Sequence, residues 1–187
     1  MKKIVLTGTS YSGKSALIER LSAIDYNTVP EAETQIVLAQ KELLGPEETG
    51  RWILENYSDF KDRVARRQRE LEVSAKNRAR LVFYDRSAIC YIAYCKLRGV
   101  EPPESLVRLA QETQPDTVFF IEKLKIFDER RVEGRVMKKE EALKLACLIA
   151  EEYQSRGFGL LRVPEFYLDK EKNVNRRTEY ILGFLKN

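Results

Sequence analysis

The chain has 187 residues, of which 43% are hydrophobic and 33% are charged, and its formal net charge is +4. This length and composition predict one soluble globular domain over residues 1–187, with no apolar run near the roughly 18 residues of a membrane span. The complete absence of histidine excludes Ser-His-Asp and Cys-His catalysis and any histidine-ligated metal site. Cys90, Cys95 and Cys147 form no C-x-x-C pair, so we expect buried thiols.

Hydrophobic periodicity predicts strands that alternate with helices along the chain. Five apolar runs are typical of strands, at residues 3–7, 27–29, 81–85, 117–121 and 159–163. The intervening stretches predict helices at about 14–23, 31–44, 47–79 (one or two helices), 87–97, 104–112, 138–156 and 174–186. This alternation predicts an α/β fold, with a doubly wound parallel sheet that is covered by helices on both faces.

The first strand and first helix are joined by a complete G-x-x-x-x-G-K-[ST] phosphate loop, Gly8-Thr9-Ser10-Tyr11-Ser12-Gly13-Lys14-Ser15. The two glycines allow successive backbone N–H groups to point at phosphate oxygens. Lys14 is expected to reach the β- and γ-phosphates, and the Ser15 hydroxyl to ligate Mg²⁺. Because the apolar start of the chain leads straight into this loop, we expect no signal peptide and a cytoplasmic protein.

The third strand ends in Asp85, and an acid at the end of an apolar strand is typical of a residue that holds Mg²⁺ opposite Ser15. Asp85 could also cap the helix that follows. Arg86 follows, at a position where motor and unfoldase ATPases usually carry a glutamate that orients water. No Asn-Lys-x-Asp motif for reading guanine occurs in the chain. Asp-Arg is similar to the pair that small-molecule P-loop kinases place beside the acceptor, so we expect a kinase rather than a hydrolase.

Two charged segments are further candidates for the site. Residues 123–137 follow the fourth strand, where P-loop kinases carry a lid whose arginines close on the phosphates, and Arg131 and Arg135 are the candidates here. A solvated charged loop is the alternative. After the second strand, Glu31 or Glu33 is placed to accept a proton from an acceptor hydroxyl, or only to favour the helix dipole.

Several motifs together resemble the P-loop ATPase/kinase family typified by the kinase portion of NadR, the nicotinamide riboside kinase. They are GTSYSGKS, VPEAE, LVFYDRS, Arg67-Gln68 in the long helix, Glu133-Gly134-Arg135 in the lid, and Tyr153 followed by Val163-Pro164. The resemblance implies strand order 2-3-1-4-5, with ATP phosphates on the loop and Mg²⁺ near Ser15 and Asp85. It also implies that Glu31 and Arg86 face the acceptor. The lid departs from the family pattern by inserting Glu129-Arg130-Arg131, so the identity of the clamping arginine stays open.

The stretch from Lys61 to Arg80 contains eight basic and three acidic residues. It is either a docking surface for an anionic acceptor, nucleic acid or lipid headgroups, or an ordinary solvated helix face. No aromatic residue lies between Phe60 and Phe83, so the stretch offers no stacking platform for bases.

These observations predict an ATP- and Mg²⁺-dependent phosphotransferase acting on a nucleoside, a nucleotide or nicotinamide riboside. Lys14 and a lid arginine are expected to stabilise the moving phosphoryl group, Arg86 to grip the acceptor, and Glu31 to act as the base. The alternatives are a slow ATPase or switch that binds an anionic partner or lipid, and a polynucleotide 5′-kinase.

Overall fold

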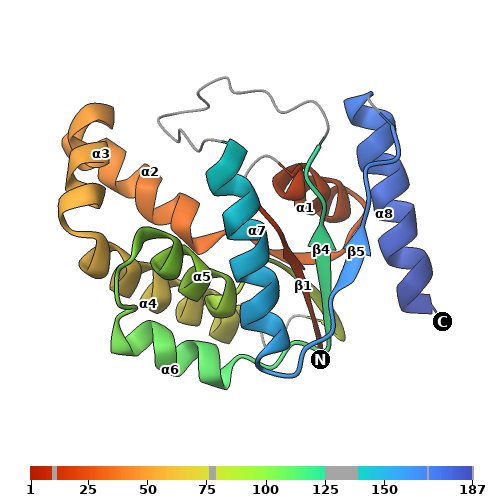
Figure 1. The fold of residues 1–187 in the computed structure, drawn as a ribbon. Helices are drawn as coiled ribbons and strands as arrows, with labels where there is room; N and C mark the ends of the chain where they lie inside the picture. Colours follow the sequence, from red (N-terminus) through yellow and green to blue (C-terminus); the bar gives the residue numbers. More distant parts are fainter. Residues whose placement is uncertain (10–11, 76–78, 125–138, 168, 187) are drawn as a thin grey trace.

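The computed structural model describes residues 1–9, 12–75, 79–124, 139–167 and 169–186 (Figure 1). Its strands are β1 (Lys2–Thr7), β2 (Asn27–Val29), β3 (Leu81–Asp85), β4 (Thr117–Ile121) and β5 (Leu161–Val163). All neighbouring strands are parallel, and their order is β2-β3-β1-β4-β5. The predicted parallel sheet and its 2-3-1-4-5 order are therefore confirmed.

The described residues also form eight helices: α1 (Lys14–Ala23), α2 (Ala32–Leu44), α3 (Pro46–Glu55), α4 (Tyr57–Ala75), α5 (Ala88–Arg98), α6 (Glu104–Glu112), α7 (Lys139–Gln154) and α8 (Lys170–Lys186). Helices α1 and α8 lie on one side of the sheet, and α4 to α7 lie on the other, as Figure 1 shows. None of the described helices is long and apolar enough to span a membrane.

Successive side chains of β1 pack alternately against the helices on the two sides of the sheet. Ile4 and Leu6 pack with residues of α1 and α8, whereas Val5 packs with residues of α4, α5, α6 and α7. Successive side chains of a strand point to opposite faces, so a central strand with two buried faces is apolar at most of its positions, as Ile4, Val5 and Leu6 are here. The core of the molecule is thus divided by the sheet into two clusters.

Several boundaries differ from the expectations: β5 begins at Leu161 rather than 159, and α4 ends at Ala75 rather than near 79. Two further differences have a clear physical reason. Helix α8 begins at Lys170 rather than near 174, because the Asp169 side chain accepts a hydrogen bond from the Lys172 N–H at 2.8 Å and caps the helix start. Cys90 and Cys95 are buried as expected, but Cys147 is exposed. It lies on the solvent face of α7, away from the buried stripe Ala142, Leu145, Ile149 and Tyr153, so burial of all three thiols was wrong.

Candidate functional site

The two glycines of the phosphate loop meet different physical demands. Gly8 has φ 136°, and a Cβ built on it would lie 2.5 Å from the Ile121 carbonyl oxygen of β4. No side chain fits this position unless the backbone of β4 moves. Gly13 has φ 85° and occupies the left-handed region at the start of α1. The loop therefore bends where the sequence motif places its glycines.

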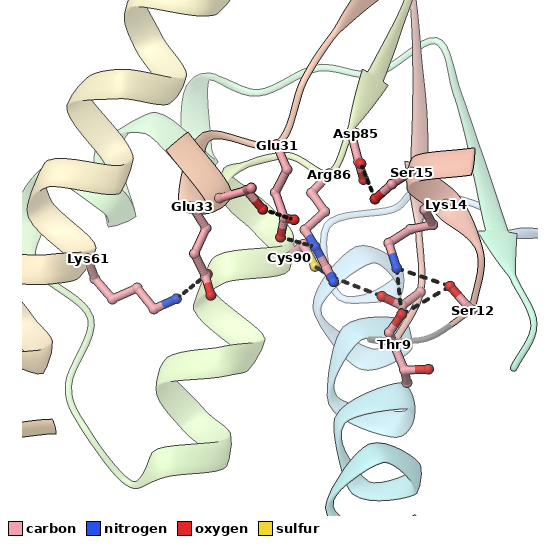
Figure 2. Close-up of polar contacts among 12 residues, drawn as sticks. Thr9, Ser12, Lys14, Ser15, Glu31, Glu33, Lys61, Asp85, Arg86 and Cys90 are labelled. Carbon is pink, nitrogen blue, oxygen red and sulfur yellow. Dashed lines mark hydrogen bonds and ion pairs between the residues drawn. The ribbon is translucent and has the colours of Figure 1, made fainter. Parts of the chain in front are cut away.

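Lys14 is buried against its own loop (Figure 2). Its Nζ donates to the Thr9 carbonyl oxygen at 2.5 Å and to the Ser12 Oγ at 3.0 Å. Burial, and secondarily the charge of Arg86, lowers the pKa of Lys14 to about 7. Because its partners here are neutral oxygens, an anionic phosphate would be a stronger partner for the ammonium group.

Ser15 and Asp85, the two residues predicted to hold magnesium, lie next to each other. The exposed Ser15 hydroxyl is 3.4 Å from Oδ2 of Asp85, at the carboxyl end of β3. Oδ1 of Asp85 is buried and has no hydrogen-bond partner among the described residues. Burial, followed by the charge of Glu31, raises the pKa of Asp85. The Ser15 hydroxyl and the Asp85 carboxylate, one oxygen of which has no partner among the described residues, are oxygen donors that fit a hard cation such as Mg²⁺.

Arg86 connects the phosphate loop to the start of α2 (Figure 2). Its Nε lies 2.7 Å from Oε1 of Glu31, and its Nη1 donates to the Gly8 carbonyl oxygen at 2.9 Å. The guanidinium also lies over the ring of Tyr94, 5.1 Å from its centroid. Arg86 has φ 71°, a conformation that costs a non-glycine residue about 1–3 kcal/mol and is typical of functional sites.

The structure separates the two glutamates that the sequence left as alternatives. Glu31 faces Arg86 beside the phosphate loop, whereas Glu33 points to Lys61 of α4, with Oε2 2.6 Å from Nζ. Figure 2 shows the two carboxylates, side by side at the start of α2, directed at different cations. Glu31 is therefore the carboxylate that lies beside the phosphate-loop residues.

Sequence reasoning missed the role of Lys61, which it counted as part of a basic surface. This side chain is fully buried, and its Nζ lies 5.0–5.3 Å from the centroids of four aromatic rings, Tyr57, Phe60, Tyr91 and Tyr94. The ammonium thus has a carboxylate and several π faces as partners, which offset the loss of water. The available signal was the helical spacing of aromatic residues around Lys61 and along α5.

The arginines of α4 also form ion pairs or hydrogen bonds with other side chains. Arg63 bonds Asp59 and Arg66 bonds Asp62, each one turn earlier on the same helix. Arg67 bonds Glu70 and the side-chain oxygen of Gln35. The excess of basic residues along this stretch therefore does not produce a row of unpaired cations among its described residues.

Four residues of the predicted site, Ser10, Tyr11, Arg131 and Arg135, lie outside the described residues, as does the rest of the lid beyond residue 124. Their predicted roles in phosphate binding and in lid closure stay predictions. The structure brings the described members of the predicted site together at the carboxyl ends of β1 and β3 (Figure 2).

Comparison with known proteins agrees with the fold described above. Two solved structures of deoxyadenosine kinase from M. mycoides are similar to the chain, one with bound dATP and one with the products dCMP and a flexible dCDP. Both give a TM-score of 0.63 at 17% identity, and they cover 99% and 98% of this chain and 100% and 98% of their own. At this identity the likeness shows a shared fold. No curated protein matches the chain. A family model described as "AAA domain" matches residues 3–170, so the chain belongs to this AAA domain family.

Proposed function

We propose that the chain is an ATP- and Mg²⁺-dependent phosphotransferase that transfers the γ-phosphoryl group to a hydroxyl of a small acceptor. The observation that carries the proposal is the ion pair of Glu31 with Arg86, which lies between the phosphate loop and helix α5. The fold shared with deoxyadenosine kinase and the motif resemblance to nicotinamide riboside kinase support an acceptor of the nucleoside class.

On the donor side, the backbone of the phosphate loop binds the phosphates and Lys14 neutralises charge on the transferring group. Ser15 and Asp85 would hold Mg²⁺, which supplies electrostatic stabilisation of the phosphates when it is bound. Arg131 or Arg135 is proposed to close over the phosphates from the lid and to exclude water, which limits wasteful hydrolysis.

On the acceptor side, Glu31 orients the hydroxyl and accepts its proton, and Arg86 fixes the carboxylate in position. The Thr34 hydroxyl donates to Oε2 of Glu31 at 2.8 Å, so both oxygens of this carboxylate have a partner that holds them. A carboxylate that is already held in one orientation loses less conformational entropy when it reaches the reactive geometry.

The charges beside this position favour a neutral acceptor. Arg86 and Lys61 are compensated by Glu31 and Glu33, and Arg67 of α4 bonds Gln35 of α2. A phosphate on the acceptor would have to displace one of these partners and leave a carboxylate or an amide without its bond. We therefore propose a nucleoside, nicotinamide riboside included, rather than a nucleotide or a polynucleotide end.

The test is label transfer from γ-labelled ATP, in the presence of Mg²⁺, to nucleosides, nicotinamide riboside, nucleotides and short oligonucleotides. One nucleoside should accept label far faster than water does. Glu31→Gln should lower this transfer by roughly 10²- to 10⁴-fold and leave ATP affinity nearly unchanged. Glu42→Gln, on the exposed face of α2, is the matched control and should behave as the wild type. Bound ATP that is consumed slowly whatever the acceptor would refute a kinase and favour a nucleotide-dependent switch.

A further inference from the structure

Arg177 is a buried cation on helix α8 that takes no part in the chemistry proposed above. Its guanidinium donates three hydrogen bonds, all to backbone carbonyl oxygens: Nε to Pro164 at 2.8 Å, Nη1 to Ser12 at 2.6 Å and Nη2 to Glu122 at 2.9 Å. The side chain is 1% exposed. One guanidinium thus joins the residues that follow β4 and β5 to the phosphate loop, which lies 165 residues earlier in the sequence.

The bond to Ser12 determines the orientation of a peptide unit inside the loop. The Ser12 carbonyl and the Gly13 N–H belong to the same trans peptide, in which the two groups point in opposite directions. Because Arg177 holds the carbonyl of this peptide, the Gly13 N–H points away from the arginine. Phosphate loops bind their ligand through backbone N–H groups, so the direction of this one bears on phosphate binding.

The local geometry places the guanidinium against Gly13. A Cβ built on Gly13 would lie 3.6 Å from Nη1 of Arg177, which is an ordinary contact distance. Gly13 has φ 85°, and glycine crosses between backbone conformations more easily than other residues. An external bond to the preceding carbonyl restricts exactly the freedom that this glycine otherwise brings to the Ser12–Gly13 peptide.

Arginine suits this position better than lysine does. Its planar fork presents several N–H donors in fixed directions, and the three carbonyls come from three separate segments of the chain. A single ammonium cannot match all three directions at once. Two of the three bonds also satisfy carbonyl groups directly after β4 and β5, at the partly buried residues Glu122 and Pro164.

We propose that Arg177 is a positioning residue of the phosphate loop, which orients the Ser12–Gly13 peptide for phosphate binding by holding its carbonyl oxygen. The proposal rests on the nucleotide-binding part of the proposed function and is independent of the acceptor. Coupling is reciprocal, so a nucleotide bound to the loop also strengthens the docking of α8.

Arg177→Met is the direct test, with Arg176→Met as the matched control. Arg176 is the exposed neighbour on α8 and pairs with Glu179. Calorimetric affinities are measured for ATP and for inorganic tripolyphosphate, which has no base, at a temperature where circular dichroism shows each variant fully folded. Both affinities should fall roughly 10- to 100-fold in Arg177→Met and should stay at the wild-type value in Arg176→Met.

A purely structural role for Arg177 predicts a different pattern. It would lower the midpoint of thermal unfolding while the folded variant keeps wild-type affinity for tripolyphosphate, and that result would overturn the proposal. If Arg177→Met does not fold, Arg177→Leu takes its place, because it too offers no N–H donor to the Ser12 carbonyl. Wild-type tripolyphosphate affinity in Arg177→Leu would equally overturn the proposal. If the wild-type chain itself binds neither ATP nor tripolyphosphate, the nucleotide site fails instead.

Discussion

Positive charges on the two sides of the candidate site are held by different kinds of partner. On the phosphate-loop side, the described partners of Lys14 and Arg177 are backbone carbonyls and a serine hydroxyl. On the side formed by α2, α4 and α5, Arg86 and Lys61 pair with carboxylates at the start of α2, at 2.7 Å and 2.6 Å. The hydrogen bonds described for the first two cations go to neutral groups, whereas each of the second two forms an ion pair with a carboxylate.

Because of this difference, the two sides of the site favour ligands of different charge. A polyphosphate that reaches the loop gains a charge-assisted bond from Lys14, whose present hydrogen-bond partners are neutral. A phosphate that reaches the other side gains little, because each cation there would first have to lose a carboxylate. The arrangement suits a charged donor on one side and an uncharged hydroxyl acceptor on the other, and the predictions below test that contrast.

The largest effect is expected on the phosphate-loop side. Lys14→Ala removes the ammonium that is placed to meet the β- and γ-phosphates, and we expect phosphoryl transfer to fall by about 10³-fold or more. Steady-state label transfer from ATP measures this loss. Lys2→Ala, an exposed lysine at the start of β1, is the control and should retain full activity. Transfer that survives Lys14→Ala within tenfold would show that this loop is not the donor site.

On the side formed by α2, α4 and α5, where cations pair with carboxylates, substitutions should lower the free energy of unfolding. Glu33→Gln leaves the fully buried Lys61 without its carboxylate, and we expect a loss of about 3–5 kcal/mol in the free energy of unfolding. The double variant Glu33→Gln/Lys61→Met removes both charges and should recover most of that loss. Urea denaturation measures both values.

The exposed pair of Asp59 with Arg63 provides the matched control for this experiment. Both side chains are about half exposed, so Asp59→Asn should cost less than about 1 kcal/mol. Equal losses in Asp59→Asn and Glu33→Gln would mean that burial does not distinguish the two pairs. The four aromatic rings around Lys61 would then be sufficient partners for its charge.

A pH effect of intermediate size should appear on the phosphate-loop side. The pKa of Lys14 is about 7 without ligand, and a bound polyphosphate favours the protonated ammonium. Above pH 7 binding must therefore take up a proton, and affinity for tripolyphosphate should fall by up to about tenfold per pH unit. Calorimetry in metal-free buffer between pH 7 and 9 measures the slope. Lys14→Ala measured in parallel gives the pH dependence that comes from the protonation of tripolyphosphate itself, and a wild-type profile with the same slope as this variant would contradict the lowered pKa.

The strands and most of the described loop were predictable because their signals are local, whereas the strand order was implied by the family resemblance. A glycine-rich motif between an apolar strand and an amphipathic helix contains its own structural context, and a buried parallel strand must be a continuous apolar run. Helix α8 was predicted too short because the capping side chain of Asp169 lies before the apolar pattern begins. A helix boundary that depends on a single hydrogen bond leaves little trace in the hydrophobic periodicity of the sequence.

The charged residues were predictable in type but not in partner. Glu31 and Glu33 are two positions apart in one turn, and their separation into two pairs depends on where α4 and α5 pack against α2. Lys61 belongs to a basic stretch by composition, and only the packing of aromatic side chains from two helices makes it buried. Arg177 meets the phosphate loop across 165 residues, a contact that no local pattern encodes.

The smallest effect is expected at the exposed face of α4. Arg66 is 74% exposed and bonds Asp62 on its own helix, so Arg66→Gln should change the free energy of unfolding by less than about 1 kcal/mol. If the acceptor is a neutral nucleoside, its KM should also stay within about twofold of the wild type in this variant, and should change little between 50 and 200 mM salt. A polynucleotide acceptor would instead lose about 10³-fold or more in affinity over that salt range if it contacts six or more phosphates. If salt weakens acceptor binding steeply and Arg66→Gln reduces that dependence, the exposed face of α4 binds the acceptor. The acceptor would then be anionic, which contradicts the proposal of a neutral nucleoside.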